Sequence, residues 1–280
     1  MAKGTGIEWT DATWNPIRGC SRVSEGCRNC YAEQVAARFS GPRQPYEHLA
    51  TFKVIDKGLE TEHVEPRWTG EVAFVEKHLR DPLKWKEPLR VFVNSMSDLF
   101  HPGVRGEWLA EIFEVMAKAP QHTYQILTKR PERMFEALEA AAYPEVAASF
   151  EKTYGQPWPP ANWIFGVSIE DQETANHRLP ILARCRAAKK MISYEPAIGP
   201  VDFPAAIGGT LECSAFDWLI MGGESGHRAR PMHPQWAREV RVLCNELGIP
   251  FFFKQTGGQR THNDYDFPED LTTVKEFPDA

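Results

Sequence analysis

The stretch Arg90-Val-Phe-Val93-Asn-Ser-Met-Ser-Asp98 indicates how this 280-residue chain folds. In it, a short apolar run rich in β-branched residues is followed by polar residues, and an amphipathic stretch comes next, at about 108–118. The same order recurs along the chain, with apolar runs at 123–127, 163–167, 191–194, 218–221 and 250–253. Helices are predicted between them at about 131–142, 171–187 and 234–247, with a shorter crossover near 197–210. Apolar strands that alternate with helices indicate a parallel sheet covered by helices.

With a first strand within residues 1–19, the pattern gives at least seven βα units. It predicts an α/β fold, a partial or complete (β/α) TIM-like barrel, and a doubly wound sheet is the alternative. We expect a single domain over residues 1–280. Within it, residues 43–89 are predicted to be a less regular insertion or lid, with a β-like run at 71–75 and a helix-like turn near 83–85, and residues 259–280 are predicted to be a C-terminal tail.

The composition limits the classes of function. The formal net charge is −6, which argues against a strongly basic nucleic-acid-binding protein but leaves room for a locally basic cleft. No signal-type segment opens the chain and no apolar run approaches the length of a membrane span, so we expect a soluble cytoplasmic protein without a membrane partner. The cytosol keeps thiols reduced. The six cysteines therefore indicate three ligands and three isolated residues, which are Cys185, Cys213 and Cys244.

The three ligand candidates are Cys20, Cys27 and Cys30, in a Cys-x6-Cys-x2-Cys pattern that opens a predicted helix at 31–39. A structural zinc site needs four ligands, and no fourth Cys or His follows at finger or ribbon spacing. A 4Fe-4S cluster normally takes four thiolates, so three would leave one iron open to a chelating small molecule. That arrangement is used in radical chemistry with S-adenosylmethionine (SAM). Zinc and free thiols are the alternatives.

The predicted strands all end in polar residues. In a barrel the active site lies at the carboxyl ends of the strands, and six polar ends beside a metal loop indicate a site. For any one residue, a helix N-cap or a solvated surface charge is the simpler interpretation. The polar ends are Asn94–Asp98, Thr128–Arg130, Ser168–Glu170, Glu195, Gly222–Ser225 and Lys254–Gln255.

Together these residues resemble the radical SAM superfamily, in particular a family of phage proteins distantly similar to spore photoproduct lyase. The resemblance spans roughly Gly6 to Gly258. It rests on Trp14-Asn-Pro, Gly19-Cys20, Cys27-x-x-Cys30-Tyr31, Ser97-Asp98-Leu-Phe-His-Pro102, Leu127-Thr-Lys129 and Val167-Ser-Ile169. It implies a barrel of the radical SAM type, with a 4Fe-4S cluster on the three cysteines and SAM as cofactor.

The resemblance also implies roles for residues at the strand ends. Ser97 and Asp98 would meet the amino group of SAM, Lys129 its carboxylate, and Ser168 or Glu170 its ribose. The longer Cys-x6-Cys spacing departs from the commonest Cys-x3-Cys loop. An aromatic residue commonly precedes the third cysteine and approaches adenine, but here that residue is Asn29. Tyr31, one step beyond the cysteine, is the aromatic residue expected to bind the cofactor. Gly222-Gly-Glu224 looks like the Gly-Gly-Glu motif of the superfamily, but that motif belongs early in the barrel and this one comes late. It is therefore placed with the substrate.

The function implied is a radical enzyme that modifies a nucleic-acid base or a modified nucleotide, such as an isomerase of glycyl-thymidine in phage DNA. It would work in the host cytoplasm with a reductant such as flavodoxin or ferredoxin. Lyase-like repair of a pyrimidine lesion is one alternative, and a zinc-stabilised binding module without catalysis is another. The residues expected to be catalytic are Glu224, Lys254 and Glu195, and those expected to bind substrate are Arg228, Arg230 and Gln255.

Overall fold

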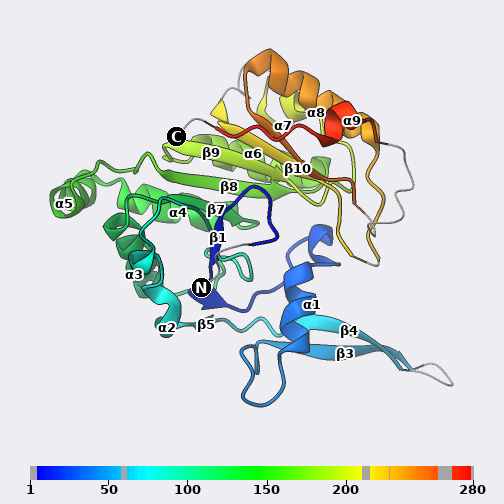
Figure 1. Cartoon of the computed structure of the whole chain (residues 1–280), viewed down its shortest axis with the longest axis horizontal. Coiled ribbons are helices and arrows are strands. Elements are labelled where there is room, and N and C mark those ends of the chain that lie inside the picture. The colour runs from blue at the N-terminus through cyan, green and yellow to red at the C-terminus, as the bar shows by residue number, and fades with distance from the viewer. Residues whose placement is uncertain (1–4, 58–61, 210–214, 227, 258–266, 279–280) are drawn as a thin grey trace.

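A seven-stranded parallel sheet, curled into a half-barrel, forms the centre of the protein (Figure 1). The computed structural model describes residues 5–57, 62–209, 215–226, 228–257 and 267–278, so Cys213 and part of the predicted tail lie outside the described residues. The strands, in sheet order, are β1 (Ala12–Trp14), β6 (Arg90–Val93), β7 (Thr123–Thr128), β8 (Trp163–Ile169), β9 (Lys189–Tyr194), β10 (Trp218–Gly222) and β11 (Phe251–Gln255).

The sheet order follows the chain order without a reversal. A doubly wound sheet reverses its order at a switch point, so that alternative is wrong for this chain. The mixed α/β fold is instead compatible with a partial (β/α) barrel, and all six predicted apolar runs from Val91 onward coincide with strands of the sheet.

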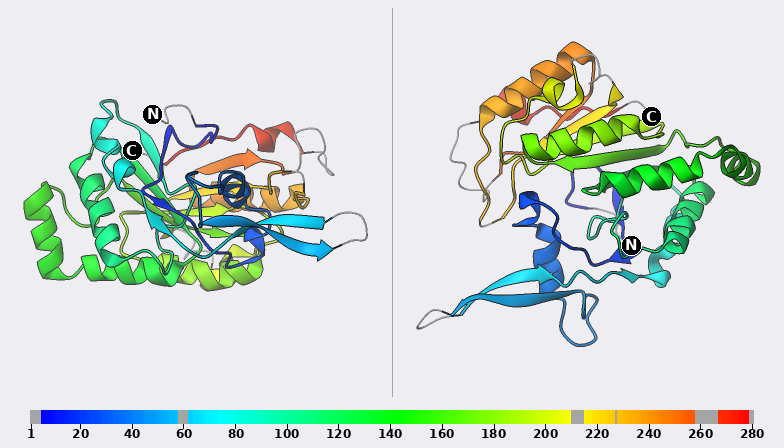
Figure 2. Two further views of the ribbon diagram at one scale, coloured as in Figure 1. Left: turned by 90° about the horizontal axis from the view of Figure 1, so that it is seen from below. Right: turned by 180° about the vertical axis from the view of Figure 1, so that it is seen from behind.

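Helices connect the strands and lie around the outside of the curl (Figures 1 and 2). Of these connecting helices, α5 was not predicted, and none of its residues is buried. Without a buried face it leaves little apolar periodicity in the sequence. The connecting helices are α3 (Gly106–Lys118), α4 (Pro131–Ala141), α5 (Pro144–Tyr154), α6 (Gln172–Arg184), α7 (Phe203–Ile207) and α8 (Pro234–Leu247).

A small apolar cluster occupies the concave face of the sheet. Side chains alternate between the two faces of a strand, so Phe165 packs in the large core cluster and its neighbour Ile164 belongs to this smaller one. Trp9, from the segment before β1, contacts Phe92 at a ring-centroid distance of 4.6 Å and Trp218 at 6.2 Å. The N-terminal segment therefore fills the concave face near the amino ends of the strands, and the polar strand ends lie beyond it.

Residues near the C-terminus connect the two sides of the half-barrel. Phe277 packs on Trp218 of β10 and Phe252 of β11, at centroid distances of 5.6 and 5.3 Å. The guanidinium of Arg90, at the start of β6, lies 4.2 Å from the Phe277 ring centroid. The segment that includes α9 (Glu269–Thr272) thus packs against the sheet, and it links β11 to β6 at their amino ends.

The crossover from β1 to β6 is long and contains the cysteine loop. Its β3–β4 hairpin projects from the body (Figure 1), and β2 pairs with β5 in a short antiparallel ladder. The hairpin was not predicted, whereas the β-like run at 71–75 contains β5 and the helix-like turn is η2. The elements are β2 (Ile17–Arg18), η1 (Glu25–Cys27), α1 (Tyr31–Arg38), β3 (Ala50–Lys57), β4 (Glu62–Trp68), β5 (Ala73–Phe74), α2 (Glu76–Leu79) and η2 (Pro82–Lys84).

Helix α1 buries a different face from the one that its large apolar residues suggested. Ala32, Glu33, Ala36 and Ala37 are buried, while the large apolar residues Tyr31 and Phe39 are 44% and 49% exposed. Buried Glu33 accepts a hydrogen bond of 2.8 Å from the Trp68 amide and pairs with Arg22, so the helix is fixed to β4 by a satisfied carboxylate. Among the described residues no helix has the length and apolar character needed to cross a membrane.

Candidate functional site

A cavity of about 470 Å³ opens at the carboxyl ends of the strands, within the range of about 300–1,000 Å³ typical of small-molecule sites. Glu170, Arg228 and Arg230 are not among its described lining residues. The other predicted site residues all line it: Cys20, Cys27, Cys30, Tyr31, Ser97, Asp98, Lys129, Ser168, Glu195, Glu224, Lys254 and Gln255.

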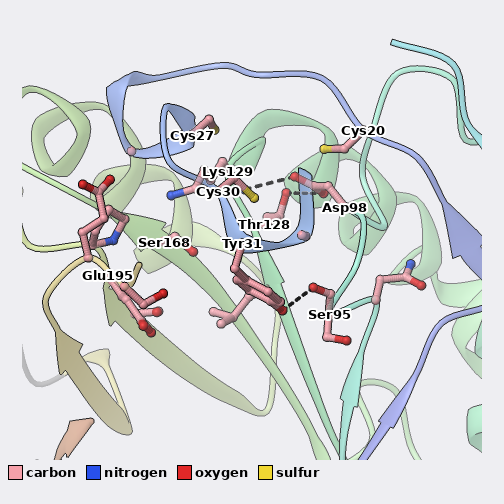
Figure 3. A pocket seen from close by; sticks show the side chains of 18 of the residues that line it. Cys20, Cys27, Cys30, Tyr31, Ser95, Asp98, Thr128, Lys129, Ser168 and Glu195 are labelled. Carbon is pink, nitrogen blue, oxygen red and sulfur yellow. Dashed lines mark hydrogen bonds between the residues drawn. The ribbon is translucent and has the colours of Figure 1, made fainter. Parts of the chain in front are cut away.

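The three cysteines of the predicted metal loop lie at the edge of this cavity (Figure 3). Gly19, which precedes the first of them, has a φ of +88°, and a Cβ there would lie 2.2 Å from the carbonyl oxygen of Glu71, so only glycine fits the entry to the loop. Burial and the nearby Asp98 carboxylate raise the pKa of the Cys20 thiol to about 12, and burial also raises the pKa of Cys30. Metal uptake would therefore displace protons from these thiols.

The thiols do not converge on one point. Within the described ranges, no three Cys, His, Asp or Glu side chains form a group that could hold a single metal ion. Figure 3 shows Cys20 and Cys27 on different sides of Cys30. A single zinc ion would need its ligands around one centre.

Asp98 connects the ends of β6 and β7. Its Oδ1 accepts hydrogen bonds from the Thr128 hydroxyl at 2.7 Å and the Phe100 amide at 2.9 Å. Its Oδ2 accepts from Arg130 Nη1 at 2.8 Å and from the Lys129 amide at 3.2 Å. Each oxygen thus accepts two bonds, and the residue is only 6% exposed.

Arg130 joins the same group to the cysteine loop. Its Nη2 donates to the carbonyl and hydroxyl oxygens of Ser21, each at 2.9 Å. His101 Nε2 lies 2.9 Å from the same hydroxyl. Neither Arg130 nor His101 was assigned a role from the sequence, although Arg130 stands in the polar end after β7. Their role depends on contacts across about 109 and 80 residues of chain, which strand-end polarity cannot reveal.

Glu170, at the end of β8, contacts the middle of the cysteine loop at Ser24 and Gly26. Its carboxylate is fully buried and pairs with Lys129 and with Arg178 Nη1, the latter at 3.0 Å. It also accepts a hydrogen bond of 2.9 Å from the Ser24 hydroxyl. Burial favours a raised pKa for Glu170, but the two cations outweigh it and lower the pKa. The residue predicted to meet a ribose is thus enclosed by protein groups.

Gly26 lies directly on Glu170, and this contact gives a test of the loop. A Cβ at Gly26 would lie 2.3 Å from Glu170 Cγ and 2.6 Å from its Cδ. Because Glu170 is held by two cations, we expect Gly26→Ala to lower the free energy of unfolding by about 1–3 kcal/mol, as measured by denaturant unfolding. Gly106→Ala is the matched control, since no atom lies within 4 Å of that Cβ. Equal stability of the two variants would contradict the packing described.

Glu224 fixes the other side of the loop. Arg230 forms an ion pair with its carboxylate, and Asn29 Nδ2 donates to its Oε2 at 2.8 Å. Asn29 also donates to the Arg228 carbonyl at 2.9 Å. Arg230 Nη2 donates to the Glu25 carbonyl at 2.8 Å. The Arg228 side chain pairs with Glu65 of the hairpin at 3.2 Å. The two arginines expected at the substrate are thus paired with Glu224 and with Glu65 of β4, and neither arginine is among the described lining residues.

Glu195 and Lys254 form an ion pair inside the cavity. Their side chains are 17% and 22% exposed, which is more open than the Asp98–Arg130 pair at 8% and 10%. Gln255 donates to the Gly223 carbonyl at 2.8 Å. Ser168 and Ser193 are opposite each other in the register of β8 and β9, and both line the cavity. Ser193 was not predicted, because it stands inside an apolar strand.

The fold and the site together define an α/β protein with a curled parallel half-barrel and a cysteine-lined cavity at the carboxyl ends of its strands. A family model described as a protein of unknown function, DUF5131, matches residues 4–275, and the chain belongs to this family. No curated protein and no solved structure gives a significant match.

Proposed function

We propose that this protein is a radical SAM enzyme that holds a 4Fe-4S cluster on Cys20, Cys27 and Cys30. The observation that supports this function best is that three thiols of one loop line the same cavity as the polar ends of six strands. An open cluster position at the rim of a barrel would lie beside bound small molecules there.

The donor set fits a cluster better than zinc. Thiolates are the soft ligands that iron–sulfur clusters take, and each thiolate of a cluster binds a different iron. The three thiols belong to one short loop and line one cavity, which is the placement that a cluster held by that loop would need. A zinc-stabilised module without catalysis would leave the cavity and its charged lining without a use.

The residues of the chain supply binding and shielding. A cluster held by Cys20, Cys27 and Cys30 would supply the electron for reductive cleavage of SAM, which is the chemistry that leads to hydrogen abstraction from an unactivated C–H bond. The apolar floor formed by Trp9, Phe92 and Leu127 excludes water from the reacting groups. Asn94 Nδ2 and Trp9 Nε1 are buried donors without a partner among the described residues, and both residues line the cavity. A heteroaromatic ring that carries acceptor atoms would supply the acceptors they lack.

We propose a nucleic-acid base as the substrate, in a reaction such as isomerisation of a glycyl-modified thymidine in phage DNA. A cavity of about 470 Å³ admits a nucleoside rather than a duplex, so the base would be turned out of the helix. Lyase-like repair requires a cysteine as hydrogen donor beside the substrate. Of the described cysteines outside the loop, Cys185 and Cys244 lie in the large core cluster and outside the described cavity lining, so neither is placed as that donor. A flavodoxin or ferredoxin in the cytoplasm would supply the electron.

Anaerobic incubation with SAM and dithionite tests the proposal. We expect 5′-deoxyadenosine to form in the iron-reconstituted protein, with a higher rate when modified phage DNA is present. A zinc-loaded sample is the control and should form none. Absence of 5′-deoxyadenosine from a sample with a full complement of iron and sulfide would reject the proposal.

A further inference from the structure

The two residues expected to clamp the methionyl end of SAM are both engaged within the protein. The Asp98 oxygens accept four hydrogen bonds from Phe100, Thr128, Lys129 and Arg130. Lys129 Nζ is paired with a carboxylate that is itself fully buried. Lys129 Nζ keeps donors to spare, but its carboxylate partner is 0% exposed, so this pair offers a ligand a cation without an accessible carboxylate. A ligand that carries both charges would therefore find a pair of partners elsewhere in the cavity.

Glu195 and Lys254 offer that unused capacity. Among the described residues, the Glu195 carboxylate and the Lys254 ammonium hydrogen-bond only to each other. A carboxylate can accept about four bonds and an ammonium can donate three. Both side chains line the cavity and are partly open to it. Figure 3 shows Glu195 on the opposite side of the cavity from Cys20.

The backbone between the two residues leaves them room. Glu195 follows β9 and Lys254 belongs to β11, and these strands flank β10. The β10 residue between them is Gly222, where a Cβ would lie 3.3 Å from Lys254 Cβ and 3.4 Å from Gln255 Cγ. Glycine at this position lets the Lys254 side chain cross β10 to reach Glu195. The Lys254 ammonium and the Glu195 carboxylate therefore lie side by side, and the β10 residue between them has no side chain.

We propose that Glu195 and Lys254 bind an α-amino acid group, whose ammonium donates to Glu195 and whose carboxylate accepts from Lys254. Such a zwitterion leaves every charge paired. A phosphate or another simple anion is disfavoured, because an anion bound at Lys254 would lie beside the Glu195 carboxylate. The lining cations Lys129 and Arg130 are likewise already paired with carboxylates. The cavity is thus suited to a zwitterion and not to a polyanion.

The group has two sources, and this part of the inference rests on the proposed function. SAM carries an α-amino acid group at its methionyl end. A thymidine that bears glycine through nitrogen on its methyl carbon carries one as well. The chemistry recognised is the same, so binding experiments must separate the two.

Paired ligands that differ only by the carboxylate make this separation. The first pair is SAM and decarboxylated SAM, and the second is the glycyl-thymidine nucleoside and its methylamino counterpart without the carboxylate. Dissociation constants are measured by calorimetry under anaerobic conditions on the iron-reconstituted wild type, Lys254→Met and Lys118→Met. Lys118 is the matched control, because it pairs with Glu114 on α3 and lies outside the described cavity lining.

Lys254→Met should weaken one carboxylate-bearing ligand by about tenfold to a hundredfold, and its decarboxylated partner by less than about twofold. Loss of SAM affinity assigns the group to SAM, and loss of nucleoside affinity assigns it to the substrate. Lys254→Arg should recover most of the lost affinity, and Lys118→Met should bind both ligands as the wild type does.

Three results would overturn the inference. Lys254→Met could lose equal affinity for both members of a pair, or it could lose no affinity for either carboxylate-bearing ligand. The third result is that the wild type binds neither carboxylate-bearing ligand. The proposed function fails separately. If the protein binds iron and cleaves SAM but the variants bind normally, only this inference is wrong. If it binds the glycyl nucleoside through Lys254 without taking up a cluster, only the proposed function is wrong.

Discussion

Cys20→Ala, Cys27→Ala and Cys30→Ala should each abolish iron binding. Each variant leaves two thiolates where the proposed cluster needs three, and no other described cysteine lines the cavity to replace the missing one. Measurement of iron and sulfide after anaerobic reconstitution checks this, together with the broad absorption near 400 nm that such clusters give. We expect a loss of essentially all bound iron in each variant.

The remaining described cysteines provide the controls. Cys185 and Cys244 are buried in the large core cluster, so Cys185→Ala and Cys244→Ala should keep full iron content with a modest loss of stability. A variant in which all three loop cysteines are replaced, yet which retains full iron, would show that the cluster assignment is wrong.

Glu170→Ala should lower the free energy of unfolding by about 3–5 kcal/mol. The substitution leaves Lys129 and the 4%-exposed Arg178 side chain without their carboxylate, and removing one partner of a buried ion pair uncovers the other charge. Denaturant unfolding measures the change. Glu114→Ala is the control, because Glu114 pairs with Lys118 on the exposed side of α3 and such pairs contribute only about 0.3–0.5 kcal/mol.

The same pair of proteins gives a pH test. The folded-state pKa of Glu170 is lowered by Lys129 and Arg178 against the opposing effect of burial. The stabilisation is therefore fully present above the unfolded pKa of about 4.3 and is lost as the pH falls through the lower folded-state pKa. The stability difference between wild type and Glu170→Ala should shrink only in that acidic window. A stability difference that stays constant from the unfolded pKa of about 4.3 down to the folded-state pKa of Glu170 would contradict the ion-pair assignment.

The position of the cysteine loop depends on contacts from three different strand ends. Arg130 after β7 holds Ser21, Glu170 after β8 holds Ser24, and Glu224 after β10 holds Asn29. Each of these side chains is itself fixed by an opposite charge. The polar strand ends thus serve first to place the loop, and only part of the lining is left for ligands. This explains why Glu195 and Lys254, which hold no part of the loop, are the open pair.

The strands of the half-barrel from β6 onward could be predicted because each contains a short apolar run, and several of them, such as β8 and β10, are buried on both faces. Burial of this kind marks the sequence directly, as at Trp163–Ile169, where all but one residue is buried. Helix α5 and the β3–β4 hairpin were missed for the opposite reason. No residue of α5 is buried, and Phe52 and Val54 of the hairpin are 50% and 39% exposed. Elements that bury little leave a weak pattern.

The sequence by itself determined the alternation of strands and helices, the loop with its three cysteines, and the polar character of each strand end. These features are local, because burial, turn chemistry and ligand spacing are set by neighbouring residues. Only the tertiary structure decided which polar residues are open to a ligand. Asp98, Glu170 and Glu224 look like site residues along the chain, yet each is paired with a cation that lies close to it in space. Charge pairing depends on distance in space, and strand-end polarity alone does not define it.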